Sequence, residues 1–288
     1  MKIGVFSGSK KLNSLSMYET EVIDYLKKND IKIYLDDRLN NLLKSDNYEL
    51  LNDIKDIDTL FTIGGDGTLL RAIPFIKNSN VPILGINTGQ LGFLTTLNKE
   101  LLVKGLDMFF ENKYDSVKRN LIKVDIQSEE AENIIFPFAL NEISINRKNS
   151  SSMLSIKTII NKNLLTTYWS DGLIISTPTG STGYSLSSGG PILSPNTEAL
   201  ILNPIAPHNI SIRPLIIPDT SEIKIEVSGR SKNHLFFLDN RKFSIKNGCS
   251  IKISKASFCI HTIQLHDNSF FKTLRNKLFW GMDMRNRQ

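Results

Sequence analysis

Asp66 stands among three glycines in the segment Gly64-Gly65-Asp66-Gly67-Thr68, and this pattern suits phosphate chemistry. Glycines let backbone N–H groups approach an anion closely, and a helix beginning just beyond Thr68 would add the positive end of its dipole. A carboxylate there would repel phosphate unless it holds a divalent cation or accepts a proton from an attacking hydroxyl. Both roles belong to phosphoryl transfer. An Asp-Gly turn that merely ends a strand is the alternative, and the whole segment favours the chemical role.

A second candidate stretch runs from Thr177 to Pro191 and consists almost wholly of hydroxyl residues, glycines and prolines, with Tyr184 at its centre. We expect such residues to contribute little to a core and to offer many small hydrogen-bond donors. A flexible linker is the alternative interpretation, but well-formed strand patterns flank the stretch closely. The pattern therefore favours a ligand-binding loop.

Two further sites carry weaker signals. The loop Asn87-Thr88-Gly89-Gln90-Leu91-Gly92-Phe93-Leu94 follows an apolar strand, and its glycines fit a binding role as well as a plain turn. Asn141-Glu142 interrupts an apolar run, and neighbouring strand residues point to opposite faces unless the strand ends or bulges there. Taken alone, that pair is predicted to lie on the surface.

The first part of the chain must position the glycine loop, and it alternates strands with helices. Strands are expected at Lys2–Phe6, Ile31–Leu35, Thr59–Ile63 and Ile83–Ile86, and helices at about Ser16–Lys28, in a polar stretch ending near Lys55, at Thr68–Lys77 and at Asn98–Asn112. Such alternation predicts an open parallel sheet, and ligands of these sheets bind beyond the carboxyl ends of the strands. The glycine loop lies at that edge.

From about Tyr114 the apolar period changes to two residues, which predicts a β-rich domain. Strands are expected at Leu121–Ile126, Ile134–Ile145, Ser155–Ile160, Leu164–Trp169, Leu173–Ser176, Ile223–Val227, Leu235–Leu238, Ser250–Ile253 and Ser257–Leu265, with a hairpin turn at Asn161-Lys162-Asn163. Ser269 is expected to cap a helix with Phe270, Leu274 and Leu278 on one stripe, packing back on the first domain. The predicted domains are 1–113, 114–266 and a returning C-terminal helix at 267–288.

Composition narrows the class of protein. The chain has 288 residues, 40% hydrophobic and 22% charged, as a soluble globular protein does. Its formal net charge of +6 is spread thinly, without the basic run or aromatic-basic interleaving of a nucleic-acid groove. No apolar run suggests a membrane span or a signal peptide. Cys249 and Cys259 have no metal-binding spacing and are expected to be core or half-buried thiols, so the predicted location is the cytoplasm.

With these segments in this order, the chain resembles the bacterial NAD kinases. The resemblance rests on Gly64–Thr68, Asn87–Leu94, Asn141-Glu142, and Ser170-Asp171-Gly172 continuing through Thr177-Pro178-Thr179-Gly180-Ser181-Thr182-Gly183-Tyr184 to Gly190-Pro191. The glycine loop by itself is also similar to loops of diacylglycerol and sphingosine kinases. The long Thr-Pro-Thr-Gly-Ser-Thr stretch is the more discriminating motif.

The resemblance implies an α/β N-terminal domain, a β-sandwich-like C-terminal domain, and NAD bound between them. ATP would phosphorylate the 2′-hydroxyl of the adenosine ribose of NAD, with a divalent cation, Mg²⁺ by preference, near Asp66. Asp66 would accept the proton, Gly64, Gly65, Gly67 and Thr68 would shape the phosphate loop, and Phe93 would pack at the adenine side. Asn141, Glu142, Asp171, Thr182, Gly183, Tyr184, Ser185, Leu186 and Ser187 would bind NAD. A homodimer or homotetramer is also implied.

Three residues depart from the family pattern: Trp169 stands where an arginine is common, Gly183 where an alanine is common, and Asp239-Asn240-Arg241 where Asp-Gly-Gln is usual. They concern the NAD contacts. The sequence is also compatible with three other functions: a lipid kinase, which would share the glycine loop, a dinucleotide sensor without catalysis, and a nucleic-acid-binding protein. An intact Asp66 counts against the sensor, and the absence of a basic amphipathic helix counts against the lipid kinase.

Overall fold

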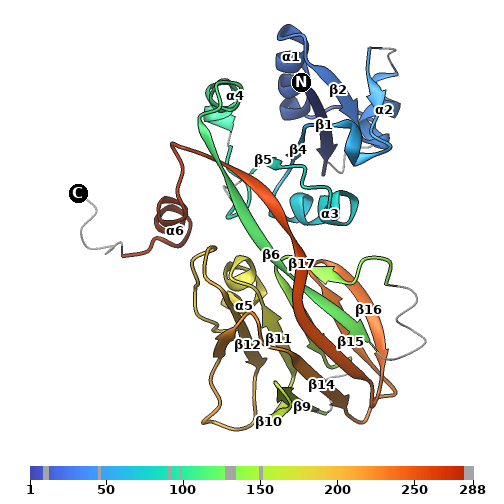
Figure 1. The fold of residues 1–288 in the computed structure, drawn as a ribbon, viewed down its shortest axis with the longest axis vertical. Coiled ribbons are helices and arrows are strands. Elements are labelled where there is room, and N and C mark those ends of the chain that lie inside the picture. Colours follow the sequence, from blue (N-terminus) through green and yellow to red (C-terminus); the bar gives the residue numbers. More distant parts are fainter. Residues whose placement is uncertain are drawn as a thin grey trace. The chain divides into compact units, whose positions relative to one another are not determined.

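The computed structural model describes residues 1–8, 13–44, 47–89, 92–97, 99–126, 134–148 and 152–281. The chain divides into two compact units (Figure 1), which are described separately. Unit 1 comprises Met1–Lys118 and Ile260–Gln288, and unit 2 comprises Arg119–Cys259. Gln90, Leu91 and Asn98, which belong to a predicted loop and a predicted helix, lie outside the described residues.

Unit 1 is built on a parallel sheet, as the alternating pattern predicts. Its strands are β1 (Lys2–Ser7), β2 (Lys32–Leu35), β3 (Glu49–Leu50), β4 (Thr59–Ile63), β5 (Ile83–Ile86) and the last part of β17 (Ser250–Leu265), in the order β17-β5-β4-β1-β2-β3. Every residue of β4 is buried, which explains its nearly continuous apolar composition. Parallel pairing of β4 with β1 and β5 brings the carboxyl ends of these strands to one edge.

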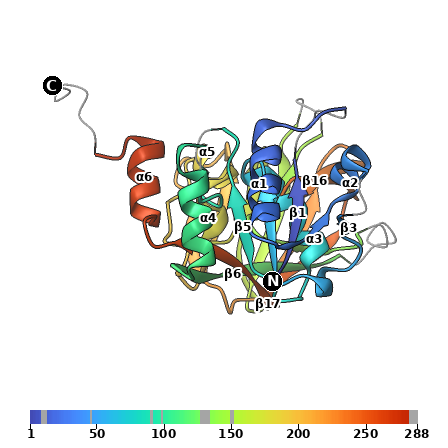
Figure 2. The ribbon, with the colours of Figure 1, turned by 90° about the horizontal axis from the view of Figure 1, so that it is seen from above.

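The helices of unit 1 are α1 (Met17–Lys28), α2 (Asp37–Leu43), α3 (Asp66–Ile76), α4 (Leu102–Phe110) and α6 (Phe270–Leu278), with 3₁₀ turns at Ile54–Asp56 and Lys99–Leu101. Helices α1 and α4 lie alongside strands β1 and β5 (Figure 2) and share their buried apolar cluster, to which α1 contributes Val22 and Leu26. Ser269 caps α6 as expected, accepting from the Lys272 N–H at 3.2 Å. Among the described residues, no helix combines the length and the apolar character needed to cross a membrane.

The polar stretch ending near Lys55 differs from its prediction. Only Asp37–Leu43 is α-helical, and a short strand and a 3₁₀ turn follow. Lys44 ends the helix in the left-handed region, with φ of 41°. That conformation is characteristic of helix C-termini, and a polarity pattern alone does not reveal it.

Unit 2 is a sandwich of two β-layers. One is antiparallel with the order β13-β12-β11-β8-β15-β16, formed by Leu215–Pro218, Ala199–Ile205, Gly172–Ser176, Glu142–Asn146, Asn233–Leu238 and Arg241–Lys246. The other contains β10 (Asn163–Ser170), β9 (Leu154–Ile160), β14 (Ile223–Ser228) and the first part of β17, together with β6 (Tyr114–Ile126) and β7 (Phe138–Ala139). The hairpin turn between β9 and β10 is confirmed, with Asn161 and Lys162 at φ of 48° and 68°.

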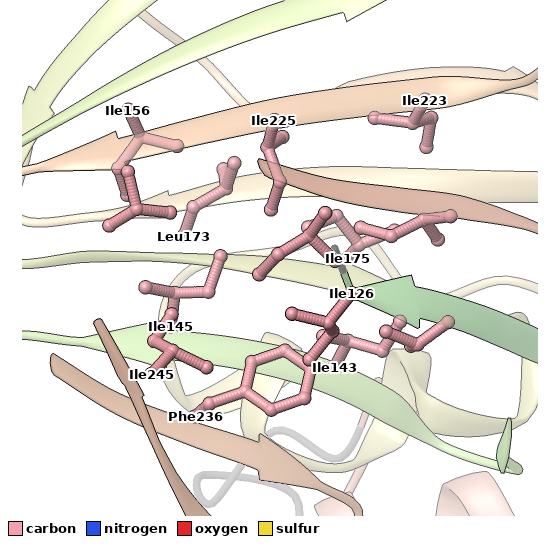
Figure 3. Close-up of a cluster of buried hydrophobic side chains, with 14 of the residues drawn as sticks. Ile126, Ile143, Ile145, Ile156, Leu173, Ile175, Ile223, Ile225, Phe236 and Ile245 are labelled. Carbon is pink, nitrogen blue, oxygen red and sulfur yellow. The ribbon is translucent and has the colours of Figure 1, made fainter. Parts of the chain in front are cut away.

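The core of unit 2 lies between these layers (Figure 3). Ile143, Leu173 and Phe236 face it from the first layer, and Ile156 and Ile225 from the second. The alternation of inward apolar and outward polar residues along β14 and β15 is the pattern of a half-buried strand. Of the two cysteines, Cys249 is buried and Cys259 is half-buried, as predicted.

Four predictions for the β-rich half need correction. The run Ile134–Ile145 is not one strand, because the chain breaks between β7 and β8. The two last strands are a single strand of 16 residues, β17. Strands β12, β13 and β16 were not predicted. The stretch after Thr177 was expected to contribute little to a core, but Thr177, Thr179, Ser181 and Ser185 are buried around a 3₁₀ turn (Thr179–Thr182) and the short helix α5 (Tyr184–Ser187).

Candidate functional site: a glycine loop and a polar turn

The glycine loop connects the buried strand β4 to helix α3. Gly64 has a φ of +152°, a region that favours glycine, and its N–H donates to the Ile86 carbonyl at 2.8 Å. A Cβ on Gly64 would overlap the Thr68 side chain. Gly65 is the N-cap of α3, so the first turn of this helix begins at Asp66. Asp66 is therefore the first residue of the helix, which begins two residues before the predicted start at Thr68.

A small polar pocket of about 160 Å³ lies at the carboxyl ends of β1 and β4. Ser7, Gly8, Ser16, Gly64, Gly65 and Thr68 are among its lining residues. Arg71 reaches back along α3 and donates to Thr68 Oγ1 at 3.1 Å. Hydroxyls, glycines, a helix N-terminus and a nearby guanidinium are the groups that bind phosphate in many proteins.

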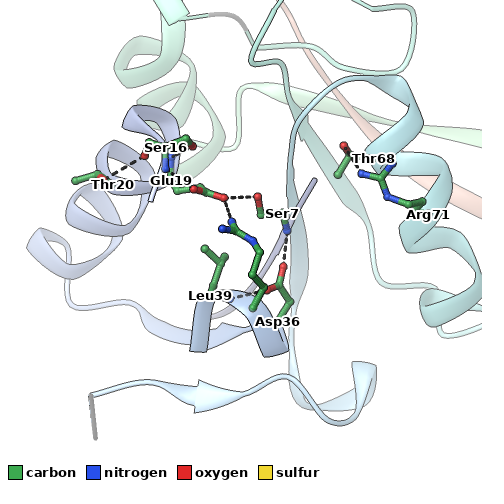
Figure 4. A network of polar contacts seen from close by, with 9 residues as sticks. Ser7, Ser16, Glu19, Thr20, Asp36, Leu39, Thr68 and Arg71 are labelled. Carbon is green, nitrogen blue, oxygen red and sulfur yellow. Dashed lines mark hydrogen bonds and ion pairs between the residues drawn. The ribbon is translucent and has the colours of Figure 1, made fainter. Parts of the chain in front are cut away.

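Glu19 ties together two walls of this pocket (Figure 4). Its carboxylate is fully buried, forms an ion pair with Arg38, and accepts from the Ser7 hydroxyl. It also accepts from the Ser16 N–H at 2.5 Å, which completes the capping box of α1. Burial lowers the pKa of the Arg38 guanidinium. Because a buried charge must be paired, this network holds Ser7 and Ser16 in fixed positions.

Asp66 is held by the loop that follows β5. Its Oδ2 accepts from the Phe93 N–H at 2.8 Å, and its Oδ1 accepts from the N–H groups of Leu94 and Thr95, each at 3.2 Å, and from the Thr95 hydroxyl at 3.1 Å. The backbone at Gly92 passes so close that a Cβ there would overlap the Asp66 carboxylate. The glycine loop and the Asn87–Leu94 loop are thus brought together within unit 1.

Phe93 connects this loop to the C-terminal helix. Its ring centroid lies 6.2 Å from that of Phe270 in α6, and the Lys277 ammonium lies 4.9 Å from the Phe93 ring centre. The Asn268 amide donates to the Thr96 carbonyl at 3.5 Å, just before α6 begins. Helix α6 therefore packs on unit 1 and contacts the loop that holds Asp66.

In unit 2, Asn141 and Glu142 form a turn between β7 and β8. Asn141 Oδ1 and Glu142 Oε2 are buried atoms with no hydrogen-bond partner among the described residues. The strand breaks at Leu140, and both residues are half-buried, so the prediction that this pair lies on the surface is met only in part. Orphaned polar atoms are costly, so ones that persist in a folded chain call for a function.

Burial, together with the nearby Asp239 carboxylate, raises the pKa of Glu142 to about 8, although a hydrogen bond from the backbone N–H of Tyr184 opposes the rise. Burial also raises the pKa of Asp239, although the N–H groups of Leu140 and Asn141 oppose this effect. Two carboxyls with raised pKa values lie beside each other here. Such perturbed groups cluster at functional sites.

The hydroxyl-rich segment from Thr177 wraps around this turn. A Cβ on Gly183 would lie 3.0 Å from Glu142 Oε2 and 3.4 Å from Asn141 Nδ2, so glycine leaves room beside both side chains. Thr182 is half-buried and Tyr184 is 42% exposed, which leaves their side chains partly accessible. Gly183 and Tyr184 therefore lie next to the Asn141-Glu142 turn.

The remaining predicted contacts differ in their exposure. Ser185 is fully buried. The Asn203 Nδ2 group donates to the Ser185 carbonyl at 2.9 Å and to the Ser185 hydroxyl at 3.3 Å, so this hydroxyl has a structural partner within unit 2. Leu186 is half-buried and Ser187 is exposed. Asp171 lies apart from this group: it precedes β11, whereas Glu142 pairs with Ser176 at the other end of that strand. Its carboxylate pairs with Arg147 at 2.8 Å.

Sequence reasoning missed the supporting residues Glu19, Arg38 and Arg71 and the role of Asp239. The Ser16-x-x-Glu19 spacing is a capping-box signal that could have drawn attention to Glu19. Nothing local marks Arg38, because its partner lies in another helix. Asp239 was noticed only as part of a departure from a motif. Within the described residues, no group of three or more His, Cys, Asp or Glu side chains could hold a metal ion.

The units and their loops define a two-domain phosphotransferase, with an α/β unit that carries a phosphate loop and a β-sandwich unit that carries a polar turn. Residues 9–114 match the ATP-NAD kinase N-terminal domain and residues 140–265 match the ATP-NAD kinase C-terminal domain. The chain belongs to the ATP-NAD kinase family.

Relatives and solved structures agree with this assignment. The chain is 45% identical to an NAD kinase of Flavobacterium psychrophilum and 41% identical to one of Christiangramia forsetii, covering 99% of this chain and 100% of each relative. Its fold is similar to that of a yeast NADH kinase solved with NADH, with a TM-score of 0.85 and 22% identity over 100% of this chain and 90% of that one. It is also similar to an NAD kinase from Archaeoglobus fulgidus solved with ATP, with a TM-score of 0.74 and 24% identity over 97% and 99% of the two chains.

Proposed function

We propose that the chain is an NAD kinase, which transfers the γ-phosphoryl group of ATP to the 2′-hydroxyl of the adenosine ribose of NAD and releases NADP and ADP. One observation supports this reaction best: Asp66 lies at the N-terminus of α3, next to a polar pocket of hydroxyls and glycines, and the loop after β5 holds its carboxylate in place. This arrangement supplies a fixed proton acceptor beside a phosphate-binding loop.

In the proposed reaction, the oxygen of the 2′-hydroxyl forms a bond to the γ-phosphorus while the bond from that phosphorus to the β,γ-bridging oxygen breaks. The hydroxyl proton passes to Asp66, and ADP carries away the electrons of the broken bond. Gly64, Gly65, Gly67 and Thr68 would shape the loop that binds the phosphates at the N-terminus of α3. Phe93 would pack at the adenine side.

A divalent cation, Mg²⁺ by preference, would arrive with the ATP phosphates. Asp66 could bind a cation that the phosphates already hold, because Oδ2 accepts only one of the four hydrogen bonds to the carboxylate and so retains lone pairs. A cation bound by the protein alone fits less well, because no cluster of several carboxylates lies among the described residues. Mg²⁺ is commonly bound by one or two carboxylates together with substrate phosphates, and it neutralises phosphate charge.

Unit 2 would bind the dinucleotide. Asn141 Oδ1 and Glu142 Oε2 lack partners among the described residues and would accept hydrogen bonds from it, and Gly183 and Tyr184 lie next to them. Thr182 would add a hydroxyl contact from the same segment. Leu186 and Ser187 continue the same surface. Ser185 would contribute through its backbone, because its side chain is buried. We also propose that Asp171 contacts NAD. Within a single chain, however, this residue lies at the opposite end of β11 from the Asn141-Glu142 turn.

We also propose that the enzyme is cytoplasmic and that it forms a homodimer or homotetramer. Light scattering coupled to gel filtration measures the assembly directly. A monomeric mass across the working concentration range would contradict it.

The reaction is tested by incubating the purified chain with NAD, ATP and Mg²⁺ and reading NADP with an NADP-specific dehydrogenase. We expect NADP only when all three components are present. Parallel reactions with NADH and with diacylglycerol test the acceptor. Phosphorylated lipid without NADP would show that the glycine loop serves a lipid kinase, and folded protein that binds NAD without converting it would be a sensor.

A further inference from the structure

The turn from Leu140 to Glu142 is fixed through its backbone. The carboxylate of Asp239 accepts from all three N–H groups, those of Leu140 at 3.0 Å, Asn141 at 2.7 Å and Glu142 at 3.3 Å. In return, the Asp239 N–H donates to the Glu142 carbonyl at 3.0 Å. The side chain of Asp239, which is almost fully buried, thus satisfies every backbone donor of the turn.

Thr177 fixes the same turn from the other side. Its hydroxyl donates to the Leu140 carbonyl at 2.6 Å, and its N–H donates to the Asn141 carbonyl at 2.9 Å. The hydroxyl also accepts from the Gly180 N–H at 3.1 Å, which joins the turn to the hydroxyl-rich segment. The backbone of the turn is therefore bonded on both sides.

The side chains of the turn, in contrast to its backbone, carry oxygen atoms that form no hydrogen bond with the described residues. Within the described part of the chain, the buried atoms Asn141 Oδ1 and Glu142 Oε2 have no hydrogen-bond partner, although the backbone of the turn is bonded on both sides. A rigid backbone that carries unsatisfied acceptors is a preorganised binding element, because the cost of ordering it has been met before the ligand arrives.

Arg241 supports this arrangement from the start of β16. Its guanidinium donates to the Phe136 carbonyl at 2.6 Å and to the Phe138 carbonyl, and it lies 5.2 Å from the centre of the Phe136 ring. Its Nη2 lies 4.0 Å from Asp239 Oδ2. Arg241 thus fastens the segment that leads into the turn and offsets the charge of the buried carboxylate.

We propose that Asp239 is a positioning residue for the dinucleotide: it holds the 140–142 turn so that Asn141 and Glu142 present their unpartnered oxygens to hydroxyl and amide donors of NAD. This inference rests on the proposed function. It assigns a role to a side chain that does not itself reach the ligand.

The variant Asp239→Asn tests this role with little change of shape. Asparagine tolerates the left-handed conformation of this residue, which has a φ of 53°, but its amide cannot accept from all three N–H groups. Asp219→Asn is the matched control, because Asp219 is another buried carboxylate of unit 2, paired with Lys255 at 2.6 Å. It follows β13, three strands from β8 in the same sheet.

We expect Asp239→Asn to raise the KM for NAD and the NAD dissociation constant about tenfold or more, with kcat and the KM for ATP nearly unchanged. Asp219→Asn should leave all four values near those of the wild type while lowering thermal stability. Unchanged NAD affinity in folded Asp239→Asn would overturn the proposal. So would a loss that falls equally on NAD and ATP and recurs in Asp219→Asn, because that result shows a structural role only.

If Asp239→Asn does not fold, Thr177→Val provides the same test from the other side of the turn, and NAD affinity equal to that of the wild type overturns the proposal. Calorimetry with NAD alone keeps this test independent of turnover. Wild-type protein that binds NAD but forms no NADP would contradict the proposed function, and the effect of Asp239→Asn on NAD affinity would still decide the inference.

Discussion

The backbone N–H of Phe93 donates to Oδ2 of Asp66 at 2.8 Å, while the Phe93 ring lies 6.2 Å from Phe270. One residue therefore links the carboxylate at the N-terminus of α3 to the C-terminal helix α6. The orientation of Asp66 depends on a loop that α6 helps to hold in place.

Phe270→Ala should disturb Asp66 at a distance. Loss of the ring removes the apolar contact that Phe93 makes with α6, so the loop from Gly92 to Thr95 becomes looser. We expect kcat to fall about two- to tenfold, because small displacements of a reacting group are costly. Steady-state kinetics measures this, with Arg275→Ala, an exposed change on the same helix, as the control. Equal kcat values in the two variants would contradict the link.

Gly92→Ala should disturb the same carboxylate directly. A Cβ at this position would overlap Asp66, so either the loop or the carboxylate must move. We expect kcat to fall about 100-fold, with a smaller change in the NAD dissociation constant. Gly89→Ala is a useful comparison in the same loop, because the nearest atom to its Cβ would be Asn87 Oδ1 at 3.8 Å. If Gly89→Ala is as harmful as Gly92→Ala, the overlap with Asp66 is not the cause.

Glu142 should make the folded chain less stable as the pH rises. Its pKa is raised to about 8 from an ordinary value of 4.5, so between these pH values the unfolded chain loses a proton that the folded chain keeps. Stability therefore falls with rising pH across this range, and the penalty is complete above about pH 8. Glu142→Gln removes this contribution. Urea unfolding at about pH 6 and pH 9 should show the variant gaining on the wild type at the higher pH, and parallel stability curves would contradict the assignment.

The buried pair of Glu19 and Arg38 should be sensitive to the loss of one partner. Arg38→Met leaves the fully buried Glu19 carboxylate without its counter-charge and should lower the free energy of unfolding by about 3 to 5 kcal/mol. Adding Glu19→Gln to this variant should recover part of the loss. Lys32→Met is the control, since its exposed ion pair with Glu49 should contribute almost nothing. A similar loss in both single variants, measured by urea unfolding, would contradict the argument.

Much of unit 1 could be predicted from the sequence because its signals are local. The buried run Thr59–Ile63, the glycines that follow and the Ser269 cap each reflect neighbouring residues, and the structure contains all three. The parallel sheet followed from the order of the elements. Strands β12 and β13 were missed because prolines and polar residues interrupt their pattern.

The candidate site divides in the same way. Asp66 and Gly183 were recognised from motifs. The hydrogen bonds that hold the Asp66 carboxylate, however, come from the backbone of residues 93–95, which lie 27 to 29 positions away in the sequence. Asp239 lies almost 100 positions from the turn that it holds, so no local pattern could reveal it. The buried position of Glu142 Oε2 likewise accompanies a strand break that alternation alone does not predict.

The central claim is that Asp66 accepts the proton of the attacking hydroxyl, and Asp66→Asn tests it most directly. The variant keeps the shape of the side chain, and its Oδ1 can still accept from the loop, but it cannot serve as a base. Measuring kcat for NADP formation beside the NAD dissociation constant, we expect kcat to fall by about two to four decades with NAD affinity largely intact. A folded Asp66→Asn protein with nearly normal turnover would contradict the account, because the chemistry would then not depend on Asp66.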